Sequence, residues 1–135
     1  MRLLMSVTSV LCLAVAMNGC SDSISPQSIV GIWQENDSPP GNLLEITLAL
    51  NASAISGQGS WCGEALGCGL TTVTGTATGN RFHLVTTFSN GRVETFDGSL
   101  VSSNSLAGIE TETTADGTHL SSDQSFTRVF RDPAS

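Results

Sequence analysis

The sequence contains no lysine and no tyrosine. It has five basic and twelve acidic residues, which gives a formal net charge of −7. Such a chain lacks the cations that neutralise phosphates, which argues against nucleic acid or an anionic lipid surface as a partner. The two histidines, His83 and His119, lie far apart and do not form the cluster of ligands that zinc requires. The one long apolar run, residues 3–17, is shorter than the roughly 20 residues of a membrane-spanning helix.

The apolar N-terminal run is typical of an export signal. Arg2 precedes residues 3–17 and small residues follow them, which is the order of a secretory signal peptide. The tetrapeptide MNGC, residues 17–20, resembles the bacterial lipobox, where cleavage precedes a cysteine that receives the lipid. We therefore predict a lipoprotein signal peptide at residues 1–19. Ordinary cleavage after Ala16, without lipid, is the alternative.

The four cysteines fit this prediction. Cys12 leaves with the signal peptide, whereas Cys62 and Cys68 lie close together in WCGEALGC and can pair in an oxidising compartment. Cys20 is then an odd exported thiol, and lipid attachment accounts for it. The expected partner of the chain is thus a membrane, reached through the lipid on Cys20.

One domain is expected to follow the anchor. Residues 20–27 are rich in serine and are predicted to form a linker, and residues 28–131 form the domain. Ser21, directly after Cys20, resembles the outer-membrane class of bacterial lipoproteins, so we expect an envelope protein at the outer membrane.

The domain is predicted to be all-β. Apolar residues alternate with polar ones, as in residues 42–50 and 80–88, and glycine-rich turns separate the runs. Asn90-Gly91 is a strong hairpin signal and predicts a type I′ turn. No segment of the domain predicts a helix. The expected strands span residues 28–35, 42–50, 53–62, 70–78, 80–88, 91–100, 105–113 and 124–130.

Short links between eight strands favour an antiparallel up-and-down barrel, because closure removes the exposed edges of the sheet. A two-sheet sandwich is the alternative. In a barrel the first and last strands pair, which would bring Trp33 and Arg128 together at one end, as a structural closure in which the cation lies over the indole.

Two short motifs resemble a known family. The GIW of residues 31–33 resembles the Gly-x-Trp signature of lipocalins and avidins, and the FTRV of residues 126–129 resembles their closing strand, in which a cation lies over that tryptophan. The resemblance implies a calycin-type eight-stranded barrel. The chain lacks the long connection and helix of lipocalins, and its only tryptophans are Trp33 and Trp61, so biotin binding is not implied.

The expected role is non-catalytic binding of a small apolar ligand in the barrel or of a protein partner at the loops. The alternative is an interaction module similar to small periplasmic protease inhibitors, which share this barrel and one disulfide. The candidate ligand-binding residues are those of the expected inward face: Leu44, Ile46, Leu48, Trp61, Phe82, Leu84 and Phe88.

An enzyme is not predicted, nor a cofactor or a metal. His83 is expected to be a lone exposed histidine, and a triad would need an orienting acid beside it. Glu110 and Glu112 share a strand face that is expected to be exposed. The polar residues that hint at a reactive interior are Thr86, Glu94 and Thr95.

Overall fold

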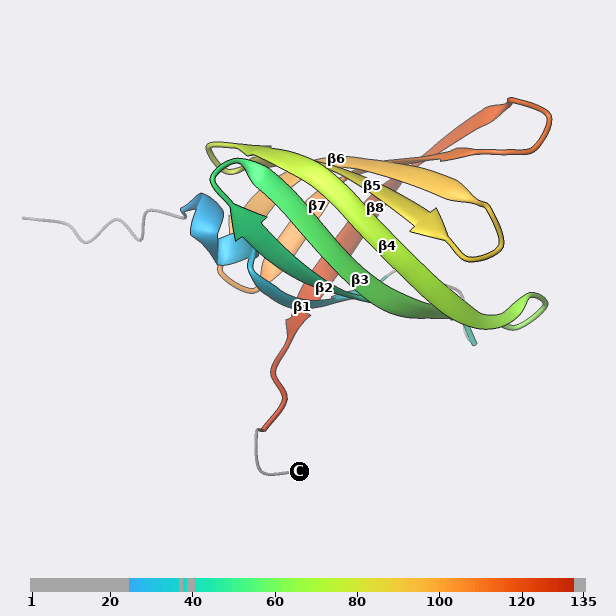
Figure 1. Cartoon of the computed structure of the whole chain (residues 1–135), viewed down its shortest axis with the longest axis horizontal. Coiled ribbons are helices and arrows are strands. Elements are labelled where there is room, and N and C mark those ends of the chain that lie inside the picture. Colours follow the sequence, from blue (N-terminus) through green and yellow to red (C-terminus); the bar gives the residue numbers. More distant parts are fainter. Residues whose placement is uncertain (1–24, 37, 39–40, 133–135) are drawn as a thin grey trace, which may run out of the picture.

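The computed structural model of the chain describes residues 25–36, 38 and 41–132, which form a closed barrel of eight strands (Figure 1). Each strand is antiparallel to the next, and β1 pairs with β8 to close the barrel. The predicted barrel is thus confirmed and the sandwich is wrong. The elements are η1 (Pro26–Ile29), β1 (Gly31–Glu35), β2 (Leu43–Asn51), β3 (Ala54–Gly63), β4 (Gly67–Thr78), β5 (Arg81–Phe88), β6 (Val93–Ser102), β7 (Ser105–Thr113) and β8 (His119–Val129).

The period-2 alternation of the strands sets the core, because successive side chains of a strand point to opposite faces. The even positions of β2 and β5 face the interior, where Ile46, Leu48 and Leu84 are each 1% exposed. Full burial of one such side chain contributes about 1.5–3 kcal/mol relative to leaving it exposed. The interior of the barrel is therefore a packed apolar core over much of its length.

Three segments differ from the predicted elements by three residues or more. One is β4, which begins at Gly67 rather than at residue 70. Residues 28–30 were expected in a strand, but η1 takes residues 26–29, because Ser28 N donates to Ser25 O at 2.9 Å. The last strand begins at His119 rather than at residue 124, because residues 119–123 pair with β7 through the backbone although they lack apolar alternation. Backbone pairing needs no apolar side chain, so the pattern did not show this extension.

The predicted hairpin at Asn90-Gly91 joins β5 to β6, but its turn is not type I′. Gly91 has φ +87°, whereas Asn90 is not among the residues with positive φ. Gly91 N donates to Phe88 O at 2.9 Å, and Asn90 Oδ1 accepts a hydrogen bond from Arg92 N at 3.0 Å. The turn therefore has one left-handed residue, Gly91, while the Asn90 side chain caps it and the chain continues directly into Arg92.

The barrel has two distinct ends. The connections β2–β3, β4–β5 and β6–β7 lie with η1 at one end, which we name the closed end, on the left in Figure 1. The connections β1–β2, β3–β4, β5–β6 and β7–β8 lie at the other, the open end. The chain enters the domain through the closed end, so the open end points away from the N-terminal side.

Trp33 and Arg128 fill the closed end, as predicted. They are direct partners in the β1–β8 register, and the guanidinium carbon lies 4.4 Å from the centre of the indole ring. Trp33 is fully buried and donates from Nε1 to Ile29 O at 2.8 Å. Arg128 donates to three carbonyls, those of Val30, Ser103 and Ser28. The polar atoms of this pair are therefore matched by backbone acceptors.

Gly31 completes the closed end and explains the spacing of the GIW motif. Its φ is +142°, and a β-carbon there would collide with Arg128 Nη1. A side chain at position 31 would both strain the backbone and displace the guanidinium. The glycine two residues before Trp33 is thus required by the arginine that covers the tryptophan.

Candidate functional site: an acidic cavity at the open end

A cavity of about 270 Å³ opens at the end of the barrel opposite Trp33 and Arg128. Its wall comes from β1, β2, β3, β5, β6, β7 and β8 and from the loops between them. The volume lies near the lower end of the range for small-molecule sites, which are concave and carry a few convergent polar groups. The lining side chains that matter chemically are Glu35, Trp61, Phe88, Arg92, Glu94, Glu110, Glu112 and Gln124.

Four glutamates converge on this cavity. Glu94 on β6 is the direct partner of Glu112 on β7, and Glu110 lies two residues before Glu112 on the same face. Like charges directly opposite each other on a sheet are destabilising. Glu35, from the end of β1, adds a fourth carboxylate. This arrangement opposes folding stability, as is common where side chains are placed for function.

The expectation that Glu110 and Glu112 lie on an exposed face is wrong. Both are half-buried and line the cavity, because they share the inward face of β7 with Leu106, which is fully buried. The even positions of β7 from Leu106 onward share one face, so the apolar Leu106 indicates that Glu110 and Glu112 also point inward. This indication was missed because polar residues occupy both faces of this part of β7.

Burial and mutual repulsion raise the pKa of two of these carboxyls. The pKa of Glu94 is raised to about 7, first by burial and then by Glu35 and Glu112, while Arg92 opposes the shift. The pKa of Glu110 is raised to about 8, first by burial and then by Glu94 and Glu35. Both groups are therefore partly protonated near neutral pH, which relieves the repulsion.

Arg92 is the one basic side chain among the described residues that line the cavity. Its guanidinium carbon lies 4.0 Å from the centre of the Phe88 ring and 5.9 Å from that of Trp61. Its Nε lies 3.2 Å from Glu94 Oε1, and this ion pair lacks hydrogen-bond alignment. The cavity thus already holds one guanidinium against an aromatic wall, beside more carboxyl groups than one cation can pair with.

Glu35 is held in place by neighbouring side chains. Gln124 Nε2 donates to Glu35 Oε1, and Ser38 Oγ donates to Glu35 Oε2. Hydrogen bonds to both oxygens of a carboxylate fix its orientation. Glu35 therefore presents a defined carboxylate to the cavity.

The predicted ligand-binding residues divide into two groups. Leu44, Trp61 and Phe88 line the cavity, and the rings of Trp61 and Phe88 meet edge to face at 5.9 Å. Trp61 is 5% exposed, and its buried Nε1 has no hydrogen-bond partner among the described residues. The other predicted residues are buried in the core and do not line this cavity: Ile46, Leu48, Phe82 and Leu84.

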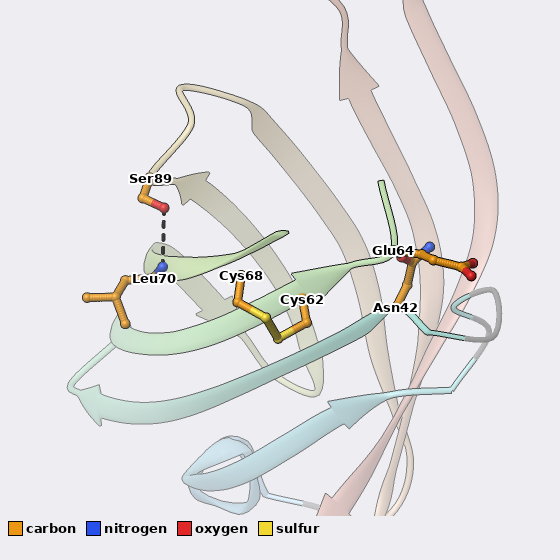
Figure 2. Close-up of a disulfide and its surroundings, with 6 residues drawn as sticks. All are labelled: Asn42, Cys62, Glu64, Cys68, Leu70 and Ser89. Atoms are coloured by element: carbon orange, nitrogen blue, oxygen red, sulfur yellow. Dashed lines mark hydrogen bonds between the residues drawn. A yellow bond between two sulfur atoms is a disulfide. The ribbon is translucent and has the colours of Figure 1, made fainter. Parts of the chain in front are cut away.

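The predicted disulfide between Cys62 and Cys68 is present beside the cavity (Figure 2). The two cysteines are direct partners in the β3–β4 register, with Cα atoms 4.0 Å apart, and Cys62 lines the cavity. The loop between them is also held by Asn42, whose Oδ1 accepts a hydrogen bond from Glu64 N at 3.0 Å. The rim of the open end is therefore cross-linked.

The histidines and the other polar candidates lie elsewhere. His83 is exposed, as predicted, but it is not alone, because its Nδ1 lies 2.7 Å from Asp97 Oδ1 on the neighbouring strand β6. His119 Nδ1 lies 3.1 Å from Thr113 Oγ1 at the β7–β8 hairpin. Three polar residues were predicted as hints of a reactive interior. Thr86 and Glu94 are buried, whereas Thr95 is half-buried and points to the outer face. Of these three residues, Glu94 lines the cavity and the two threonines do not.

Within residues 25–36, 38 and 41–132, no helix has the length and apolar character needed to cross a membrane. Across the same part of the chain, no three His, Cys, Asp or Glu side chains are grouped to hold a metal ion. The predicted lipidation site Cys20, the signal peptide at 1–19 and most of the linker lie outside the described residues. No family model matches the chain, and neither the characterised proteins nor the solved structures include a significant match.

Proposed function

We propose that the protein is a non-catalytic binding protein whose cavity takes a ligand with a positively charged group on an apolar or aromatic body. The observation that carries this proposal is the excess of four glutamates over one arginine in a cavity walled by Trp61 and Phe88. Carboxylates attract an ammonium or guanidinium group, and aromatic faces add cation–π and apolar contact. The apolar ligand predicted from the sequence is thereby refined to an amphipathic cation.

The proposal also places the protein in the bacterial envelope, anchored through a lipid on Cys20. Pairing of Cys62 with Cys68 leaves Cys20 as the remaining cysteine after the predicted signal peptide. The chain enters the barrel at the closed end, so the acidic cavity would open away from the membrane. The mass of the mature protein, beside that of Cys20→Ala, tests the anchor: a lipid mass shift that the variant loses is expected, and an unlipidated wild type cleaved after Ala16 would contradict it.

Ligand binding is tested with phenethylamine and its neutral analogue 2-phenylethanol, titrated into residues 21–135 in a calorimeter. The amine should bind at least about tenfold more tightly, since a close charge pair contributes more than 1.4 kcal/mol when partly desolvated. At pH 9, above the raised pKa of Glu110 of about 8, Glu110→Gln should weaken binding of the amine and leave that of the alcohol unchanged. The control Asp123→Asn removes an exposed carboxylate of β8 outside the cavity and should change neither affinity. Equal affinity for the amine and the alcohol would contradict the proposal.

A further inference from the structure

We infer that the open end docks a polypeptide partner that presents an arginine or lysine side chain beside apolar residues. This inference rests on the proposed function, because the basic head would enter the acidic cavity. It goes further by assigning the surface around the cavity mouth and the chemical class of the occupant.

The mouth of the cavity carries exposed leucines. Leu43 is 41% exposed and Leu66 is 62% exposed, and both belong to the cavity lining. A small amine confined to a space of about 270 Å³ would leave the outer faces of these side chains in water. Apolar side chains around a pocket that anchors one side chain are typical of protein interfaces. The rim therefore fits a ligand that extends beyond the cavity over the side formed by β2, β3 and the β3–β4 loop.

The rim is also rigid before any partner arrives. The Cys62–Cys68 bond closes the loop that carries Leu66, Leu66 N donates to Gly63 O at 3.1 Å, and Asn42 holds Glu64 (Figure 2). A surface that is fixed in advance loses less conformational entropy on binding. An exposed leucine on a cross-linked loop is thus placed as a contact residue.

Charge complementarity determines the kind of partner. The cavity holds four glutamates and one arginine, and the whole chain carries a formal net charge of −7. This field attracts a basic segment and speeds its encounter. A second copy of the same chain would present an equally acidic open end, so like charges oppose self-association through this surface. A basic polypeptide is therefore the occupant that the observations favour.

The test compares three probes by calorimetry: N-acetyl-Leu-Arg-Leu-amide, the same peptide with neutral citrulline in place of the arginine, and N-acetyl-Arg-amide. The tripeptide should bind the wild type about tenfold more tightly than N-acetyl-Arg-amide, since its leucines remove rim surface from water. It should also bind at least about tenfold more tightly than the citrulline peptide, because the latter lacks the charge.

Two variants test whether the leucines of the rim cause the higher affinity of the tripeptide. Leu43→Ser with Leu66→Ser should abolish the advantage of the tripeptide and leave N-acetyl-Arg-amide unchanged. Leu70→Ser is the matched control, because Leu70 is 71% exposed on β4 but does not line the cavity. Leu70→Ser should still bind the tripeptide more tightly than N-acetyl-Arg-amide. Circular dichroism is used to check that each variant folds.

The outcomes separate the two proposals. Equal binding of the tripeptide and N-acetyl-Arg-amide, or an advantage that survives in the rim variant, would overturn the docking surface while leaving the cation site intact. Equal loss in the rim variant and in Leu70→Ser would also overturn it. Equal binding of the arginine and citrulline peptides would overturn the cation site itself and the inference with it.

Discussion

Arg128 and Arg92 each place a guanidinium over an aromatic ring, at opposite ends of the same barrel. At the closed end Arg128 lies 4.4 Å from Trp33 and donates to three backbone carbonyls. At the open end Arg92 lies 4.0 Å from Phe88, but it faces carboxylates and its buried Nε lacks an aligned acceptor. The same contact between a guanidinium and an aromatic ring therefore lies among neutral carbonyls at one end and among carboxyl groups at the other.

The difference shows how one contact can serve stability or binding. Neutral carbonyls satisfy Arg128 without adding charge, so its side chain is held by backbone that the fold has already positioned. Burial raises the pKa of Glu94 and Glu110, the neighbouring glutamates add to this shift, and Arg92 does not cancel it. The closed end thus stabilises the barrel, whereas the open end retains unpaired charge that a ligand can satisfy.

The largest effect is expected from breaking the closed end. Arg128→Ala should lower the free energy of unfolding by about 3 kcal/mol, because it removes the cation–π contact and leaves three carbonyls without their donor. Urea denaturation followed by circular dichroism measures the loss, and the emission of Trp33 should shift as its ring loses its cover.

Arg131→Ala is the control for that experiment. Arg131 pairs with Glu45 on the outside of the barrel, and its side chain is 62% exposed. The loss of a surface ion pair should cost less than about 1 kcal/mol. If Arg128→Ala costs no more than Arg131→Ala, the closed end is not a stabilising closure.

A smaller effect is expected from the cross-link at the open end. Cys62→Ser with Cys68→Ser should lower the free energy of unfolding by about 2 kcal/mol, because the bond closes a short loop and restricts the unfolded chain. The advantage of the Leu-Arg-Leu peptide over N-acetyl-Arg-amide should also shrink, since Leu66 loses its fixed position. A loss of stability with unchanged peptide binding would separate the disulfide from the docking surface.

An effect of the open end is also expected in the pH dependence of stability. The folded-state pKa values of Glu94 and Glu110, about 7 and about 8, lie above the ordinary value of 4.5, so the folded protein binds more protons than the unfolded chain between these limits. Stability should therefore fall as pH rises from about 5 to 8, because the buried carboxyls of the folded protein must then lose their protons.

Glu110→Gln isolates this effect. The variant should lose part of the pH dependence and be more stable than the wild type at pH 8, as thermal unfolding at several pH values would show. Asp123→Asn, on the exposed outer face of β8, should retain the wild-type slope. A slope of opposite sign in the wild type would mean that these carboxyls are stabilised, not destabilised, by the fold.

The sequence by itself determined the barrel and its closed end. The alternation through Leu44, Ile46 and Leu48 has one apolar face, so only one register buries it, and short connections leave closure as the way to pair every strand edge. The Trp33–Arg128 contact followed from closure, because the first and last strands must then be neighbours.

Only the tertiary structure decided the character of the open end. Alternation from Leu106 points to the inward face of β7, but polar residues occupy both faces of its second half, so Glu110 and Glu112 were expected outside. The β6–β7 register places Glu112 opposite Glu94, and the end of β1 brings Glu35 to the same cavity across the closed barrel. Charges distant in sequence repel or bind a common ligand only after the sheet closes, because electrostatic interaction depends on distance in space and on the water that burial removes.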